Sequence, residues 1–165
     1  MIDRQRLEAI CREAGQMALR QWPGHGHALE SWEKTPGSPV CTADLQVDAF
    51  LKRELQALLP SAGWLSEETV DHPERLEKGL CWLVDPIDGT RDFIRGRPGW
   101  AVSVALVSEG KPLLASLVAP ARGETWSATP ARAPGAMASV CRRARAPRCP
   151  ARASQPTPCR KRTRT

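Results

Sequence analysis

The run from Trp82 to Thr90 constrains this chain more than any other stretch. An apolar segment typical of a buried strand ends in two aspartates three residues apart, and Gly-Thr follows at once. Pro86 fixes its own φ and turns the chain, while Gly89 lets backbone N–H groups approach an anion. A helical turn starting at Thr90 would offer further N–H groups to a phosphate. The run therefore predicts oxygen ligands for Mg²⁺ or Mn²⁺ beside a phosphate site.

A second acidic cluster, Glu67-Glu68, follows another short apolar run. If it meets Asp85 and Asp88 in one cleft, about four negative charges gather there and raise one another's pKa, a conflict that bound cations relieve. Taken alone, Glu67 and Glu68 are equally well a solvated turn. Beside the downstream motif, the interpretation as metal ligands is preferred.

The order of periodic segments predicts an α+β fold, with two N-terminal helices packed on an antiparallel sheet. Apolar residues recur at helical spacing over 3–20 and 43–59, with Thr42 as the expected N-cap of the second helix. Residues 28–41 contain Pro and Gly and are expected to form a loop with at most one strand. The remaining short apolar runs, separated by tight-turn residues, predict consecutive antiparallel strands. These runs are 63–66, 80–84, 101–107, 112–119 and 124–128.

Charge divides the chain near residue 130. Residues 131–165 hold 10 of the 24 basic residues and have no Asp or Glu. Residues 1–130 hold the other 14 basic residues and all 18 acidic residues, a net charge of −4. The whole chain carries +6. The basic segment is rich in Arg, Ala, Pro and Cys and has no periodicity, so it cannot bury enough surface to order itself. We expect one domain over 1–130 and a disordered low-complexity tail over 131–165.

Targeting and redox signals are sparse. No apolar run approaches the roughly 20 residues of a membrane span, and the charged N-terminus does not have the pattern of a secretory signal. Cys11, Cys41 and Cys81 lie among apolar residues and are interpreted as reduced core thiols. The default prediction is a cytoplasmic protein.

The motifs resemble those of the inositol monophosphatase superfamily, the magnesium-dependent, lithium-sensitive phosphatases. Residues 85–90 match its Asp-Pro-[Ile/Leu]-Asp-Gly-Thr hexapeptide in full, and residues 67–69 match its upstream Glu-Glu-[Ser/Thr]. Asp44 matches its aspartate at a helix start, and the resemblance covers residues 3–128. It implies the N-terminal half of the layered sugar-phosphatase fold and a metal-dependent phosphoric monoester hydrolase.

The resemblance also implies the metal ligands. Glu67, Asp85 and the carbonyl of Ile87 would hold one Mg²⁺, and Asp85 and Asp88 would contribute to a second. Asp44 would lie near a third, weaker position. Mn²⁺ is an alternative ion, and Li⁺ is expected to inhibit.

The catalytic and substrate-binding roles follow from the same resemblance. Glu67 with Thr90 would orient the water that attacks phosphorus, and Asp44 would complete the catalytic set. The N–H groups of Gly89 and Thr90 would hold the phosphate, with Asp88 among the substrate-binding residues.

The subfamily is indicated by the residues that flank these motifs. Residues 91–94 and 38–40, with Lys34, resemble the 3′(2′),5′-bisphosphate nucleotidase branch. The predicted substrate is a small phosphorylated metabolite, either 3′-phosphoadenosine 5′-phosphate or inositol monophosphate. Arg91 and Arg95 are surface charges or contacts for a second phosphate. A homodimer is among the expected partners, because relatives often dimerise; nucleic acid and membrane are not.

Two features leave alternatives open. The family's second half, which supplies another metal-binding aspartate, is not recognisable here, so a catalytically incomplete fragment is the alternative to an active enzyme. The tail over 131–165 is a nucleic-acid-binding arm or the product of a reading-frame change near residue 131. Because it has no aromatic residue for base stacking, the frame change is preferred.

Overall fold

The structure is a computed structural model, and it describes residues 3–26 and 29–129. Its first helix, α1, spans Arg4–Gln21 and begins where Asp3 Oδ1 accepts a hydrogen bond from the Gln5 amide at 2.9 Å. The helix buries one apolar stripe, as its sequence spacing predicts. The stripe consists of Leu7, Ile10, Cys11, Ala14, Gly15 and Ala18. The predicted tail, 131–165, lies outside the described residues.

The second helix, α2, spans Thr42–Leu58. The sequence predicted Thr42 as its N-cap and residue 43 as its first helical residue, so the predicted start is one residue too late. Thr42 is the first helical residue, and Cys41 is the N-cap. The reason is Asp44, whose Oδ2 accepts a hydrogen bond from the Cys41 amide at 2.8 Å and so fixes the turn one residue earlier.

Five strands form one sheet in the order β3-β4-β5-β6-β7. Neighbouring strands pair antiparallel except β3 and β4, which are parallel. The prediction of consecutive antiparallel strands is wrong for that pair. A tight turn joins only antiparallel strands, and the chain between β3 and β4 instead crosses over through the short helix η2, Pro73–Glu77. The strands are β3 Gly63–Ser66, β4 Cys81–Asp88, β5 Ala101–Ser108, β6 Lys111–Ala119 and β7 Glu124–Ala128.

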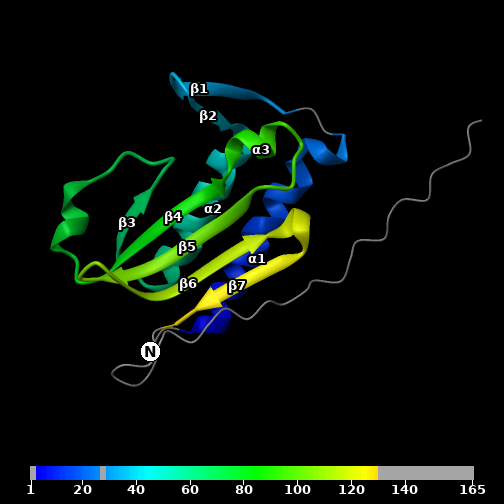
Figure 1. Ribbon diagram of the computed structural model, residues 1–165. Coiled ribbons are helices and arrows are strands. Elements are labelled where there is room, and N and C mark those ends of the chain that lie inside the picture. Colours follow the sequence, from blue (N-terminus) through cyan, green and yellow to red (C-terminus); the bar gives the residue numbers. More distant parts are fainter. Residues whose placement is uncertain (1–2, 27–28, 130–165) are drawn as a thin grey trace, which may run out of the picture.

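The two long helices cover one face of this sheet, which confirms the α+β class (Figure 1). Helix α1 contacts β5 and β6, and α2 contacts β4. Between the layers lies an apolar core whose largest side chains are almost fully buried. They include Trp82, Trp100, Phe93, Leu7, Leu51 and Leu55. In the described part of the chain, no helix is long and apolar enough to cross a membrane.

Residues 31–41 form a two-stranded hairpin instead of the expected loop with at most one strand. Strand β1, Ser31–Thr35, pairs antiparallel with β2, Ser38–Cys41. Gly37 has φ 83°, which supplies the left-handed residue of the turn. The hairpin lies beside the short helix α3, Thr90–Ile94, which follows β4 (Figure 1). The remaining single turns are η1, Pro23–His25, and η3, Pro120–Arg122.

Candidate active site

The end of β4 leaves the sheet at the predicted motif. Pairing with β5 is irregular between Asp85 and Asp88, where Pro86 has no amide hydrogen to donate. Gly89 follows with φ 91°, and a Cβ there would lie 2.6 Å from the carbonyl oxygen of Gly99. A side chain at position 89 would therefore suffer both backbone strain and a clash. Glycine allows the chain to turn directly into α3.

Glu67 and Asp85 meet because β3 and β4 run parallel. The register places Ser66 beside Val84, so the residues that follow them are neighbours at the same end of the sheet. The Glu67 amide donates to the carbonyl of Val84 at 3.3 Å, which brings the Glu67 carboxylate close enough to raise the pKa of Asp85.

The electrostatics of Asp85 reflect this crowding. Burial raises its pKa to about 7, and the negative charges of Glu67, Asp88 and Asp44 act in the same direction. The acids predicted at the site are therefore close enough to influence one carboxyl group. They are Asp44, Glu67, Asp85 and Asp88. A cation at this point would favour the deprotonated form and remove the repulsion.

Thr90 and Asp44 form a second group beside the first. Thr90 Oγ1 lies 2.9 Å from the Ile87 carbonyl oxygen and 3.2 Å from Asp44 Oδ1. Asp44 is fully buried, which raises its pKa, although hydrogen bonds from Cys41 and Thr90 oppose this. The side-chain partner of Thr90 in the structure is therefore Asp44, and the expected joint role of Thr90 and Glu67 at a water stays a prediction.

Glu68 has a different partner from its neighbour Glu67. Lys34 Nζ, on the hairpin, lies 2.6 Å from Glu68 Oε2 and 3.2 Å from the carbonyl oxygen of Glu67. The Glu68 side chain is only 3% exposed, and burial raises its pKa while Lys34 lowers it. This ion pair holds the hairpin over the acidic cluster. Sequence reasoning noted Lys34 as a subfamily signal but missed the contact, because 34 positions separate the two residues.

Asp48 is a supporting residue whose contacts the sequence did not predict. It is buried on α2, one turn after Asp44, and accepts hydrogen bonds from the hydroxyls of Ser66 and Thr69, the latter at 2.7 Å. These bonds fix both ends of the segment that carries Glu67. The sequence carries one signal for this role: Asp48 follows Val47 directly and so borders the apolar stripe of α2, where a buried acid needs hydrogen-bond donors.

The donor set suits a hard divalent cation. Glu67 and Asp85 supply carboxylates, and the Ile87 carbonyl lies on the same bend of the chain. In the described residues, no group of three or more His, Cys, Asp or Glu side chains is arranged to hold a metal ion alone. Mg²⁺ in proteins is often held by one or two carboxylates, with water and substrate phosphate completing its shell. Two carboxylates and a carbonyl therefore fit Mg²⁺ with open positions for phosphate and water.

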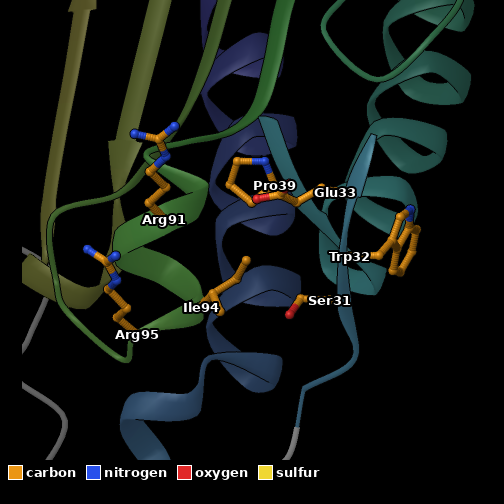
Figure 2. Close-up of a pocket in the computed structure, with 7 residues that line it drawn as sticks. All are labelled: Ser31, Trp32, Glu33, Pro39, Arg91, Ile94 and Arg95. Carbon is orange, nitrogen blue, oxygen red and sulfur yellow. The ribbon is translucent and has the colours of Figure 1, made fainter. Parts of the chain in front are cut away.

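A cavity of about 330 Å³ lies between the hairpin and α3. Figure 2 shows Arg91 of α3 and Arg95, which follows the helix, on one side, with Trp32, Glu33 and other hairpin residues on the opposite side. Arg91 Nη2 donates a hydrogen bond to the carbonyl of Gly37, so this guanidinium ties α3 to the hairpin turn.

The chain is thus a layered α+β protein with an acidic cluster where β3 and β4 end. The family model described as "Inositol monophosphatase family" matches residues 4–157, a range that runs past residue 130. The chain belongs to the inositol monophosphatase family.

Two curated relatives illustrate the range of substrates. The 3′(2′),5′-bisphosphate nucleotidase CysQ of Salmonella typhimurium is 34% identical over 132 residues, covering 73% of this chain and 53% of that protein. A histidinol-phosphatase of Chlorobaculum parvum is 34% identical over 119 residues, covering 72% of this chain and 44% of that protein. The chain thus spans about half the length of the curated relatives it matches.

Solved structures agree with this assignment. The extragenic suppressor protein suhB of Bartonella henselae superposes with a TM-score of 0.69 and 30% identity, covering 82% of this chain and 51% of that one. An IMPase/NADP phosphatase complexed with Mg²⁺ and phosphate has a TM-score of 0.62; at 23% identity it supports the fold alone.

Proposed function

We propose that this chain acts in the Mg²⁺-dependent hydrolysis of a phosphate monoester on a small metabolite. The observation that supports this most directly is the neighbouring pair of acids, Glu67 and Asp85, next to the glycine turn that starts α3. A carboxyl group whose pKa is raised by burial and by neighbouring acids is a natural cation site, because a cation favours its charged form. The curated relatives named above are phosphatases.

The cation ligands are proposed as follows. Glu67, Asp85 and the Ile87 carbonyl hold one Mg²⁺, and Asp88 contributes to a second position. When bound, Mg²⁺ neutralises phosphate charge and lowers the pKa of a coordinated water. The contribution of the chain is then to position the reactants and to balance charge, as is usual in phosphoryl transfer.

The water is oriented by Thr90 and Asp44. The one hydrogen of the Thr90 hydroxyl has two acceptors within reach, the Ile87 carbonyl at 2.9 Å and Asp44 Oδ1 at 3.2 Å. With the Ile87 carbonyl on the cation, the hydroxyl would donate to Asp44 and keep a lone pair that accepts a hydrogen from the attacking water. Glu67 receives the water's other hydrogen. Asp44 is buried and held by Cys41, so it fixes the direction of the Thr90 hydroxyl.

The phosphate is held at the start of α3. The first N–H groups of a helix have no partner inside the helix, and those of Gly89 and Thr90 are available to phosphate oxygens. Gly89 has φ 91° and is the N-cap of α3, so these groups lie where the chain turns from β4 into the helix. Asp88 lies beside them and links the phosphate site to the cation site.

The substrate is inferred to be 3′-phosphoadenosine 5′-phosphate. The similarity to CysQ proteins supports it, as does the cavity beside α3, which Arg95 lines and where its guanidinium would contact a second phosphate. Inositol monophosphate and histidinol phosphate are the competing substrates, the second because of the histidinol-phosphatase relative. A catalytically incomplete fragment is the alternative, since the chain spans about half of these relatives.

A phosphate-release assay with Mg²⁺ and these three substrates tests the proposal. Asp88→Asn is expected to reduce turnover by about 100-fold or more, because it removes a charged ligand from the reaction centre. Asp71→Asn is the matched control, since Asp71 is an exposed acid on the crossover before η2. Chelation of Mg²⁺ should abolish activity. Absence of turnover in chain that is folded by circular dichroism would favour the incomplete fragment.

A further inference from the structure

A second cavity lies at the end of β3 that is farther from the acidic cluster. Its volume is about 280 Å³, and its walls come from α2, the first residues of β3 and the crossover around η2. Glu67 follows the other end of β3, about 13 Å from Gly63 along an extended strand. The cavity shares no lining residue with the one beside α3. We call it the crossover cavity, and the lining residues with relevant chemistry are Lys52, Trp64, His72, Glu74, Arg75 and Lys78.

Positive charge gathers around this cavity against the charge balance of the domain. The first 130 residues of the chain hold 14 basic and 18 acidic residues, a net charge of −4. Three of those basic residues, Lys52, Arg75 and Lys78, line the crossover cavity, whereas Glu74 is the acid in its described lining. Asp71 offsets part of the Arg75 charge from outside the lining. Three basic residues against two acids favour an anionic ligand.

Arg75 retains hydrogen-bond donors for such a ligand. Its Nε and Nη2 donate to the two carboxylate oxygens of Asp71, at 2.6 and 2.9 Å, which leaves the hydrogens of Nη1 without an acceptor among the described residues. A Cβ on Gly63 would lie only 2.8 Å from the Cβ of Arg75, so glycine at this position lets η2 pack against the start of β3. This packing carries Arg75 into the cavity wall. A guanidinium N–H that binds a phosphate oxygen forms a strong, charge-assisted hydrogen bond.

Lys52 and Lys78 supply the other two positive charges. Lys52 Nζ lies 5.8 Å from the centroid of the Trp64 ring, a cation–π distance that keeps the ammonium group beside the cavity. The indole is held in turn, because Trp64 Nε1 donates to Thr69 Oγ1 at 3.4 Å. Lys78 is exposed and has no acidic partner in the part of the chain that the structure describes. Both ammonium groups can therefore donate to a bound anion.

We propose that the crossover cavity binds a phosphate group, carried by inorganic phosphate or by a small phosphorylated metabolite. Its volume lies just below the range for drug-sized ligands, about 300–1,000 Å³, so a phosphate with few attached atoms fits and a dinucleotide does not. Arg75 Nη1 and the ammonium groups of Lys52 and Lys78 hold the phosphate oxygens, and the Trp64 ring forms one wall. The site requires neither a cation at the acidic cluster nor catalysis there, so it is independent of the proposed function.

Titration of inorganic phosphate into the whole, metal-free chain, followed by ¹H–¹⁵N NMR, tests the site. Without a cation the acidic cluster repels phosphate, so binding reports on other positions. The indole N–H signal of Trp64, identified by its absence in Trp64→Phe, should shift and saturate. Lys78→Gln should weaken binding by about threefold, and Lys52→Gln combined with Lys78→Gln by about tenfold or more. Lys111→Gln, at an exposed lysine on β6, is the matched control and should leave binding unchanged.

The proposal is overturned if the indole signal shows no saturable shift, if sodium chloride at equal ionic strength reproduces the shift, or if the folded double-lysine variant binds phosphate with unchanged affinity. Loss of binding in Arg95→Gln would also overturn it, because the phosphate would then lie in the cavity beside α3. Glycerol 3-phosphate, titrated in the same way, distinguishes the two sources of the phosphate group. Tighter binding than inorganic phosphate supports the site with a phosphorylated metabolite as ligand, and equal or weaker binding supports it with free phosphate.

Discussion

At the level of single residues, the site depends on a few positions where one chemical group is irreplaceable. Burial and the neighbouring acids raise the pKa of Asp85 to about 7, so the surroundings of this residue disfavour its charged form. Gly89 is irreplaceable for a different reason, because both its φ and the nearby Gly99 carbonyl exclude a side chain. Both residues belong to the motif that the sequence analysis singled out.

The backbone strain and the steric clash that a side chain at position 89 would cause can be separated by experiment. Gly89→Ala should destabilise the chain by about 1–3 kcal/mol or more, since strain at positive φ adds to a contact of 2.6 Å. Gly110→Ala is the control, because Gly110 has φ 72° but nothing near its absent side chain. It should show only the strain. Urea unfolding followed by circular dichroism measures both, and equal losses of stability in the two variants would contradict the proposed clash.

At the level of elements, the important relationships are contacts between segments that lie far apart in sequence. Asp48 on α2 holds the segment after β3, and Lys34 on the hairpin holds Glu68. The parallel pairing of β3 and β4 then brings Glu67 to Asp85. The acids converge because several elements position the short segment that carries Glu67 and Glu68.

Asp48→Ala tests whether that support matters. Removing the carboxylate leaves the hydroxyls of Ser66 and Thr69 without their buried acceptor, which should cost about 1–3 kcal/mol of stability. It should also weaken Mg²⁺ binding, because Glu67 is then held less firmly. Thermal unfolding and Mg²⁺ titration measure the two effects. An unchanged Mg²⁺ affinity in the destabilised variant would limit Asp48 to a packing role.

The sequence predicted the elements better than their arrangement. Helical periodicity identified α1 and α2, and the β4 motif placed Asp85, Asp88 and Gly89, because these signals are local. The parallel β3–β4 pair was missed, since nothing in the crossover specifies strand direction. The β1–β2 hairpin was missed because its first strand is exposed throughout and has no apolar alternation. The contacts of Lys34 and Asp48 join distant residues and leave no local pattern.

At the level of the whole molecule, the acidic cluster couples folding to pH and to cations. The folded-state pKa of Asp85, about 7, lies above the ordinary value of 3.8. A raised carboxyl pKa contributes stability that is fully present below the unfolded value and is lost as pH rises through the folded value. The metal-free chain should therefore become less stable between about pH 4 and pH 7. A cation that binds the deprotonated cluster offsets this loss.

The central claim, that Glu67 and Asp85 form a cation site, is tested most directly by thermal unfolding with and without Mg²⁺ at pH 5 and pH 8. We predict that Mg²⁺ raises the unfolding temperature more at pH 8 than at pH 5. Asp85→Asn should remove both this effect and most of the pH dependence of the metal-free chain, while Asp71→Asn preserves the Mg²⁺ effect at both pH values. A Mg²⁺ effect that is absent at pH 8, or that survives in Asp85→Asn, would contradict the account.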